Sequence, residues 1–227
     1  MIQDAVDAFA QIFTPPFRAV LIKSLALTLA ILIIAWFGLD RLLVSFVGFG
    51  PSWLSTILAI LAGLGLFVGL AFLVAPITSL TAGFFLDEIA LVVEREINPS
   101  GPLGQPVAFG AAALCALRFA GLSILVNLVA LALLLAPGVN VFAFLAANGY
   151  LLGREYFELA AMRYRSFEEA RAMRRHFGVQ VFAAGLIVAG FVAVPVLNLC
   201  TPLFATAFMT RLHRRWTLER TSSGQPR

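Results

Sequence analysis

The sequence predicts an all-α integral membrane protein with two long transmembrane helices, two partly penetrating helical hairpins tipped by Pro-x-x-Asn, and an N-terminal interfacial helix. Composition is the first observation. Hydrophobic residues make up 61% of the 227 residues and charged residues 12%, whereas soluble chains are about 45–50% apolar and about 25% charged. The second observation is the presence of long uncharged stretches, and the third is a pattern that occurs twice. We therefore interpret residues 1–227 as a single membrane domain.

The pattern that occurs twice is an apolar hairpin, in residues 118–154 and again in residues 177–211. Each copy has two uncharged arms, a helix-breaking Pro-x-x-Asn between them and basic residues at its feet. A returning arm of about 12–15 residues spans about 18–22 Å, against a hydrocarbon core of about 30 Å. This length favours tips at mid-membrane depth, as in transporters and channels, although full crossing stays an alternative. The tips are Pro137 to Asn140 and Pro195 to Asn198.

The N-terminal residues 1–23 predict an interfacial helix followed by a turn. The apolar residues Ile2, Val6, Phe9 and Phe13 fall on one helical face. The segment is too short and too polar to cross a bilayer, so we expect it to lie in the membrane interface.

Residues 24–98 predict two long helices joined by a turn at residues 48–51. Gly63, Gly65 and Gly69 in the second helix predict close packing against another helix. We expect this helix to run without a break through its charged end to residue 98.

Two charged segments complete the chain: residues 155–176, a predicted cytoplasmic helix with ion pairs at helical spacing, and residues 212–227, a polar tail. If both termini lie inside, every Lys and Arg except Arg41 lies inside too. Cytoplasmic segments are rich in these residues, so the sequence predicts a multi-pass protein with both termini cytoplasmic.

Several classes of function have no support in the sequence. No HExxH, Walker or GxSxG motif is present, and His176 and His213 lie among arginines, so we predict no enzyme and no cofactor. Cys115 and Cys200 lie in apolar stretches without metal-ligand spacing, and we expect no metal. The basic charge fits cytoplasmic loops, so nucleic acid is not an expected partner.

Arg18 is the sharpest candidate for binding an anion. It follows Pro15-Pro16, where the interfacial helix gives way to the first spanning helix. A guanidinium offers a planar fork of donors to oxyanions. The alternative is an arginine that anchors the helix by extending to the membrane surface.

The tip residues Asn140 and Asn198 also have two interpretations. Asparagine side chains cap helices and satisfy free amides at a break. The alternative is a polar group that lines a pore, aided by the positive ends of helices. The matched positions of the two residues favour tips that line a pore or cavity.

The second hairpin, with Pro195 to Asn198, Pro202 and an alanine-rich helix to Arg211, resembles the C-terminal signature of the CysZ family of sulfate permeases. The charged cytoplasmic segment and the order of the N-terminal elements fit the same family. The resemblance implies a bacterial inner-membrane protein that admits sulfate for cysteine synthesis and assembles as a homo-oligomer.

The resemblance also implies an anion site in the turn after the first helix, where the family has a Gly-aliphatic-Arg-Arg motif. The matching residues are Pro16, Phe17, Arg18 and Ala19. The first arginine is kept, while the glycine and the second arginine are replaced. The candidate anion-binding residues are therefore Arg18, Phe17 and Ala19.

We expect a channel-like sulfate permease, with sulfate and the lipid bilayer as partners. The alternative is a membrane scaffold or assembly factor whose basic cytoplasmic face recruits soluble proteins.

Overall fold

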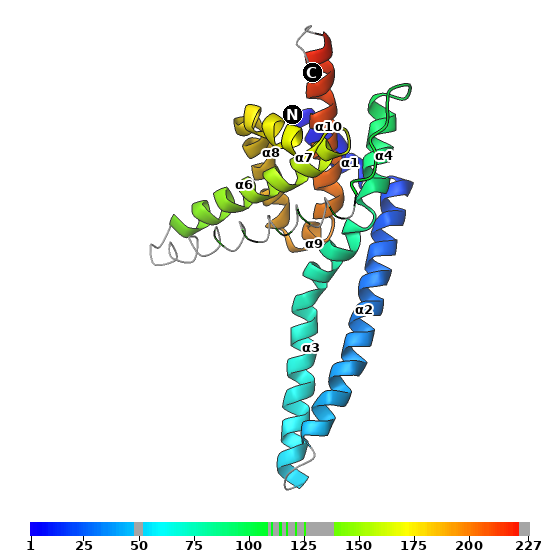
Figure 1. Ribbon diagram of the computed structural model, residues 1–227. Coiled ribbons are helices and arrows are strands. Elements are labelled where there is room, and N and C mark those ends of the chain that lie inside the picture. The colour runs from blue at the N-terminus through cyan, green and yellow to red at the C-terminus, as the bar shows by residue number, and fades with distance from the viewer. Residues whose placement is uncertain are drawn as a thin grey trace. The chain divides into compact units, whose positions relative to one another are not determined.

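The computed structural model describes residues 1–47, 52–108, 110, 114, 117, 121, 125 and 139–222. These residues form helices and no strands, which confirms the all-α class for the described part of the chain (Figure 1). The chain divides into two compact units. Unit 1 holds residues 1–18 and 86–227, and unit 2 holds residues 19–85.

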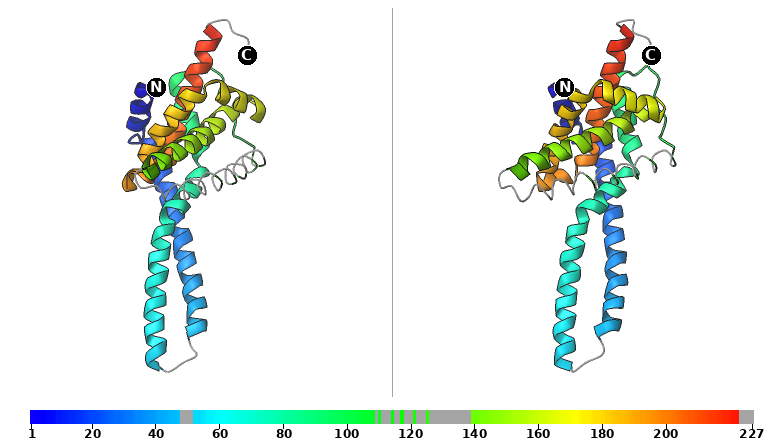
Figure 2. Two further views of the ribbon diagram at one scale, coloured as in Figure 1. Left: turned by 90° about the vertical axis from the view of Figure 1, so that its left-hand side faces the viewer. Right: turned by 60° about the vertical axis from the view of Figure 1, so that its left-hand side comes forward.

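Unit 2 consists of two long antiparallel helices (Figures 1 and 2). Helix α2 spans Pro15–Val47, of which residues from 19 onward belong to this unit, and α3 spans Ser52–Gly83. Buried hydroxyl groups join the two helices. The Thr28 and Thr81 hydroxyl oxygens lie 2.8 Å apart, and the Thr81 hydroxyl also lies 3.1 Å from the Ser24 carbonyl oxygen. Hydrogen bonding satisfies these polar groups where water cannot reach them.

Apolar side chains cover the outside of unit 2. Leucine, isoleucine and phenylalanine side chains along both helices are exposed, among them Leu29, Ile34, Phe37, Ile60, Leu61, Leu64 and Phe67. Within the described residues, Pro15–Arg41 is a helix long and apolar enough to cross a membrane, and Ala59–Leu70 is a shorter apolar segment.

The second long helix does not run unbroken to residue 98. Helix α3 ends at Gly83, and a separate helix, α4, spans Leu86–Ile97 in unit 1. At the break, the Phe84 amide donates to the Thr81 carbonyl oxygen at 3.2 Å. This bond closes a tighter turn than the α-helical pattern and ends the helix.

Helix α10, Thr201–Ser222, is the central element of unit 1. It contacts α1, α4, α6 and α8, and every residue from 201 to 214 is buried. Aromatic rings fill the space toward α8, where Phe191 stacks on Phe204 with ring centroids 4.3 Å apart. The returning arm of the second hairpin is therefore the core of this unit.

Helix α1, Ile2–Gln11, turns its polar face toward the protein and its apolar face outward. Ile2 is 78% exposed and Val6 is 54% exposed. Gln11, by contrast, is buried and donates to a Glu96 carboxylate oxygen in α4. A helix at the surface of a soluble protein has the opposite arrangement.

Helices α6, Val139–Met162, and α8, Gly178–Val192, cross in close contact through glycines. A carbon added to Gly185 would lie 1.9 Å from the Gly149 carbonyl oxygen and 2.8 Å from the Gly153 Cα. Only hydrogen side chains fit at this crossing, in the manner of small-residue helix interfaces in membranes. No atom lies within 4 Å of a carbon added to Gly63, Gly65 or Gly69, so no other described helix of this chain packs closely against those glycines.

Between these helices the chain does not form the single helix expected over residues 155–176. Helix α6 continues to Met162, and α7, Phe167–His176, follows a turn. Ser166 caps α7: it accepts a hydrogen bond from the Glu169 amide, and Glu169 bonds back to the Ser166 amide. This capping box fixes a new helix start. Helix α7 then meets α8 at a bend of 91°.

Replacing Gly185 with alanine should destabilise the protein, because the added methyl group meets the backbone of α6. The matched control is Gly190→Ala in the same helix, where no atom lies within 4 Å. We expect Gly185→Ala to lower the free energy of unfolding by about 1–3 kcal/mol or more. Gly190→Ala should leave the free energy of unfolding unchanged or raise it by up to about 1 kcal/mol. Thermal unfolding in detergent measures both; equal midpoints would show that the helices do not cross here.

Candidate functional site

The three residues predicted to bind an anion lie in the first turn of α2. Phe17 is fully buried, whereas Arg18 and Ala19 are exposed. The Arg18 amide donates to the Thr14 carbonyl oxygen at 3.0 Å. The Arg18 guanidinium has no hydrogen bond or ion pair with another described residue, and it is therefore available for a ligand from solution.

The start of α2 offers few backbone donors to an anion. Its first two residues, Pro15 and Pro16, have no N–H group, and the Arg18 amide is already bonded. The Thr14 hydroxyl donates to the Gln11 carbonyl oxygen at 2.6 Å. Anion binding at this helix start would therefore depend mainly on the Arg18 side chain.

The second hairpin tip is a single helical turn, α9, Pro195–Asn198, with Pro195 at its first position. The Asn198 amide donates to the Val194 carbonyl oxygen at 2.9 Å. The Asn198 side chain is half-buried and has no hydrogen bond with another described residue. Pro202 is buried as the second residue of α10. At the first tip, Pro137 lies outside the described residues, and Asn140 is described only as part of α6.

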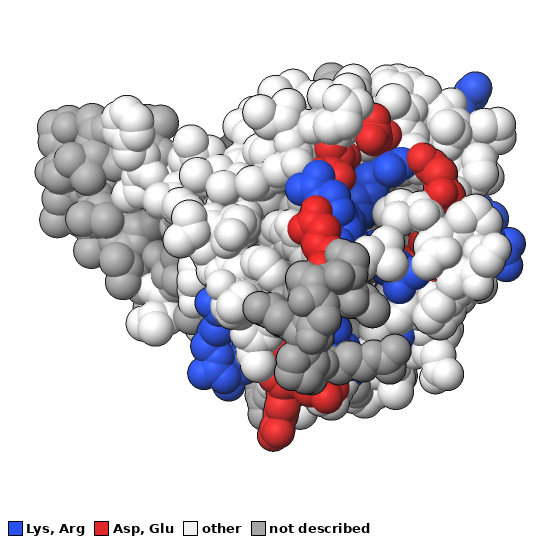
Figure 3. Space-filling model, turned by 90° about the horizontal axis from the view of Figure 1, so that it is seen from above, with Lys and Arg blue, Asp and Glu red and all other residues white. Residues whose placement is uncertain are grey.

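Ion pairs fasten the C-terminal half of α10 to α1 and α4. An Arg211 Nη atom lies 2.6 Å from a Glu96 carboxylate oxygen and another lies 3.9 Å from an Asp7 oxygen. One turn later, Arg215 lies 2.6 Å from an Asp4 oxygen. Figure 3 shows several Lys and Arg side chains next to Asp and Glu side chains.

A buried pair, Glu94 and Arg163, joins α4 to the end of α6. Glu94 is 0% exposed, and Arg163 donates to both of its carboxylate oxygens, at 2.8 and 3.3 Å. The Gly104 amide donates to the same carboxylate at 3.0 Å, and Asp87 accepts another bond from Arg163. This fork geometry satisfies the charges that burial would otherwise penalise.

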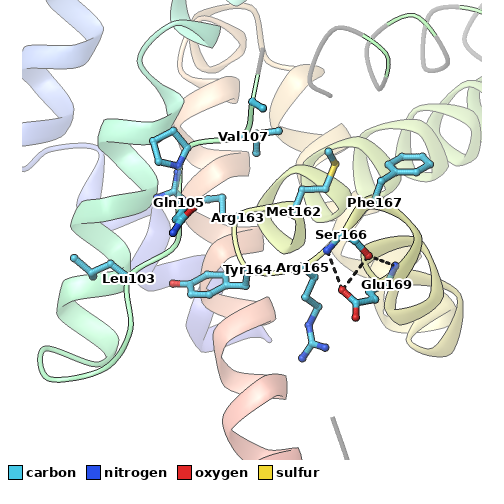
Figure 4. Close-up of a pocket in the computed structure, with 12 residues that line it drawn as sticks. Leu103, Gln105, Val107, Met162, Arg163, Tyr164, Arg165, Ser166, Phe167 and Glu169 are labelled. Atoms are coloured by element: carbon cyan, nitrogen blue, oxygen red, sulfur yellow. Dashed lines mark hydrogen bonds between the residues drawn. The ribbon is translucent and has the colours of Figure 1, made fainter. Parts of the chain in front are cut away.

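A pocket of about 590 Å³ opens beside this pair, between the 103–108 segment and the turn after α6 (Figure 4). Its apolar wall includes Leu103, Val107, Met162 and Phe167, and its polar wall includes Gln105, Arg163, Tyr164, Arg165, Ser166 and Glu169. The Glu169 carboxylate accepts hydrogen bonds from the amide and hydroxyl groups of Ser166.

Polar groups of α10 gather beside Tyr164. His213 stacks on the Tyr164 ring with centroids 5.4 Å apart, and the Arg214 guanidinium lies 4.8 Å from the centroid of the same ring. His213 is 0% exposed. Burial, together with the nearby guanidinium groups of Arg165 and Arg214, lowers the pKa of His213 to about 3. The imidazole is therefore neutral at physiological pH.

Sequence reasoning placed His213 at the membrane surface among arginines, and it did not single out Glu94, Arg163 or Arg214. A signal for the α10 residues was present. Thr206, Thr210, His213, Arg214 and Thr217 recur at helical spacing, which marks a polar stripe along an otherwise apolar arm. The pairing of Glu94 with Arg163 joins distant segments, and no local spacing predicts it.

In the described part of the chain these features define a class: an all-helical protein with one helix long and apolar enough to cross a membrane. The family model described as "Sulfate transporter CysZ/Etoposide-induced protein 2.4" matches residues 4–202. The chain belongs to this family, which includes sulfate transporters. The match confirms the resemblance to the CysZ family that the sequence suggested. No curated protein matches the chain.

The depressed pKa of His213 predicts a loss of stability in acid. The unfolded chain takes up a proton at His213 below about pH 6.5, whereas the folded protein takes it up only near pH 3. This stabilisation is complete above pH 6.5 and decreases as the pH falls toward 3. Between pH 7 and pH 5 the parent should lose about 2 kcal/mol more than His213→Gln.

Thermal unfolding across this pH range measures the difference, and His176→Gln is the control because His176 is exposed. The control should follow the parent. A His213→Gln variant with the same pH dependence as the parent would contradict a buried, neutral His213.

Proposed function

We propose that this protein is a channel-like sulfate permease that admits sulfate across the inner membrane for assimilation into cysteine. The observation that carries the proposal is the family match over residues 4–202, whose description names a sulfate transporter. The exposed Arg18 guanidinium, without a carboxylate partner in the described part of the chain, supports it. The absence of a nucleotide-binding motif from the sequence fits a passive route, not ATP-driven transport.

In this proposal α2 and α3 both span the membrane. Their 33 and 32 residues correspond to about 50 Å of helix, which exceeds the hydrocarbon core, so each helix would tilt or protrude. The exposed apolar side chains on both helices would face lipid. Helix α1 would lie in the interface with its outward apolar face among the lipid tails. Both termini would be cytoplasmic, as the distribution of Lys and Arg indicates.

The two hairpins would enter from the cytoplasmic side without crossing. Helix α8 has 15 residues, about 22 Å, and is shorter than the hydrocarbon core of about 30 Å. Its bend of 91° against α7 suits a helix that lies along the surface before the chain turns inward. Asn198 and Asn140 would then lie at mid-membrane depth, where lipid cannot satisfy broken backbone.

Covering the tips at that depth requires protein on all sides, which favours a homo-oligomer. In such an assembly the tips would line an aqueous route for sulfate. Arg18, with Phe17 and Ala19 beside it, would bind the anion at the cytoplasmic end of α2 through its guanidinium fork.

The alternative is a scaffold that recruits soluble proteins through a basic cytoplasmic face. Many arginines of unit 1 are already paired with carboxylates, including Arg154, Arg163, Arg174, Arg211 and Arg215. Paired charges attract acidic partners less than free ones, so this alternative has less support.

Sulfate flux into liposomes that hold the purified protein tests the proposal. Radiolabelled sulfate should enter faster than into empty liposomes, and excess unlabelled sulfate should compete better than chloride or phosphate. Arg18→Ala should reduce uptake at low sulfate by at least about tenfold, since it removes the charge-assisted hydrogen bonds to the anion.

Arg171→Ala is the control for loss of charge, because Arg171 is exposed and has no ion pair among the described residues. It should transport like the parent. Parent flux equal to that of empty liposomes would favour the scaffold. Equal uptake by Arg18→Ala and the parent would make Arg18 a membrane anchor.

A further inference from the structure

Arg214 carries a buried charge that the permease proposal does not use. Its side chain is 4% exposed, and its Nε atom has no hydrogen-bond partner. No carboxylate of the described residues pairs with it; its identified contact is the Tyr164 ring. A buried guanidinium without a counter-charge is costly, and a ring face compensates only part of that cost.

Hydrogen-bonding groups without partners surround this charge. Both ring nitrogens of His213 are buried and unbonded, and so is the Thr210 hydroxyl oxygen. Thr210 precedes Arg214 by one helical turn, and His213 and Arg214 both contact the Tyr164 ring. Native proteins leave few buried polar groups unbonded, so such a set needs an explanation.

Arg165 brings a second positive charge to the same place. The charges of Arg165 and Arg214 both help to lower the pKa of His213. The Arg165 Nε atom is buried without a hydrogen-bond partner. Tyr164 and Arg165 also line the pocket of about 590 Å³ (Figure 4). Two members of the cluster therefore border a pocket open to solution, whereas His213 and Arg214 lie behind them and do not line it.

We propose that Arg214, Arg165, His213 and Tyr164 form an oxyanion-binding site made of residues other than Arg18. The ligand is a tetrahedral oxyanion, either free sulfate or phosphate or the phosphodiester of a lipid headgroup. Two guanidinium groups balance its charge and donate to its oxygens. The neutral imidazole supplies a further donor, and the Tyr164 ring forms one wall of the site.

The nearest acidic groups do not fill this site. Glu94 lies near Tyr164, but Arg163 and the Gly104 amide occupy its carboxylate. Glu169 lies near Arg165, but it is bound to Ser166 in the capping box. Both carboxylates are held by other donors, so no carboxylate of the described residues is left as the counter-charge for Arg214.

The test is anion-dependent thermal stability of the purified full-length protein in detergent. Sulfate and inorganic phosphate are titrated at constant ionic strength, with gluconate as the balancing anion. The unfolding midpoint of the parent should rise and saturate. Arg214→Gln and Arg165→Gln should each weaken the apparent affinity by about tenfold or more, whereas Arg171→Gln should keep the saturating response.

Arg214→Gln should also fold without added anion, because it removes an unpaired buried charge. If it does not, Arg165→Gln decides the matter, since Arg165 is only half-buried. Equal affinity in Arg214→Gln, Arg165→Gln and Arg171→Gln would overturn the proposal.

A second arm distinguishes the sources of the anion. Phosphatidylglycerol is added to the micelles, with phosphatidylcholine as the control. Stabilisation by phosphatidylglycerol alone, lost in Arg214→Gln, identifies a lipid headgroup as the occupant of the site. No response of the parent to sulfate, phosphate or phosphatidylglycerol would overturn the proposal, whether or not the protein transports sulfate.

Discussion

The buried pair between Glu94 and Arg163 is the interaction on which the rest of unit 1 depends. The carboxylate receives two bonds from the guanidinium and one from the Gly104 amide, so α4, the 103–105 segment and the end of α6 meet at one point. Removing one partner of such a pair costs about 3–5 kcal/mol. The same point borders the pocket, and Tyr164 next to Arg163 contacts His213 and Arg214 of α10.

The charged side chains of α1 face the protein, and its apolar side chains consequently face outward. Arg211 and Arg215 bind carboxylates of α1 and α4, and α1 consequently presents Ile2 and Val6 to its surroundings. In water this arrangement would expose costly apolar surface; at a membrane it places each face in a suitable solvent. The ion pairs of Arg211 also hold the basic foot of the second hairpin against α1 and α4.

Periodicity and composition predicted the helical class and the helix α1, because these depend on local spacing. The break after Gly83 and the capping box at Ser166 were missed, although Ser-x-x-Glu is a local signal. The burial of Glu94, Arg163 and His213 depends on contacts between distant segments and has no local pattern. Gly149, Gly153 and Gly185 form the close crossing, which depends on which helices meet and not on glycine frequency.

We propose that the second hairpin, held at its basic foot, ends within the membrane. The most direct test of this proposal uses Leu197→Cys in a chain with Cys115 and Cys200 replaced by alanine, and a bulky, membrane-impermeant maleimide. Arg175→Cys, on exposed α7, should react from the cytoplasmic side. Leu197→Cys should resist labelling from the periplasmic side, because the arm of about 22 Å is too short to cross. Rapid periplasmic labelling at position 197 would show that the tip crosses the membrane, contrary to this proposal.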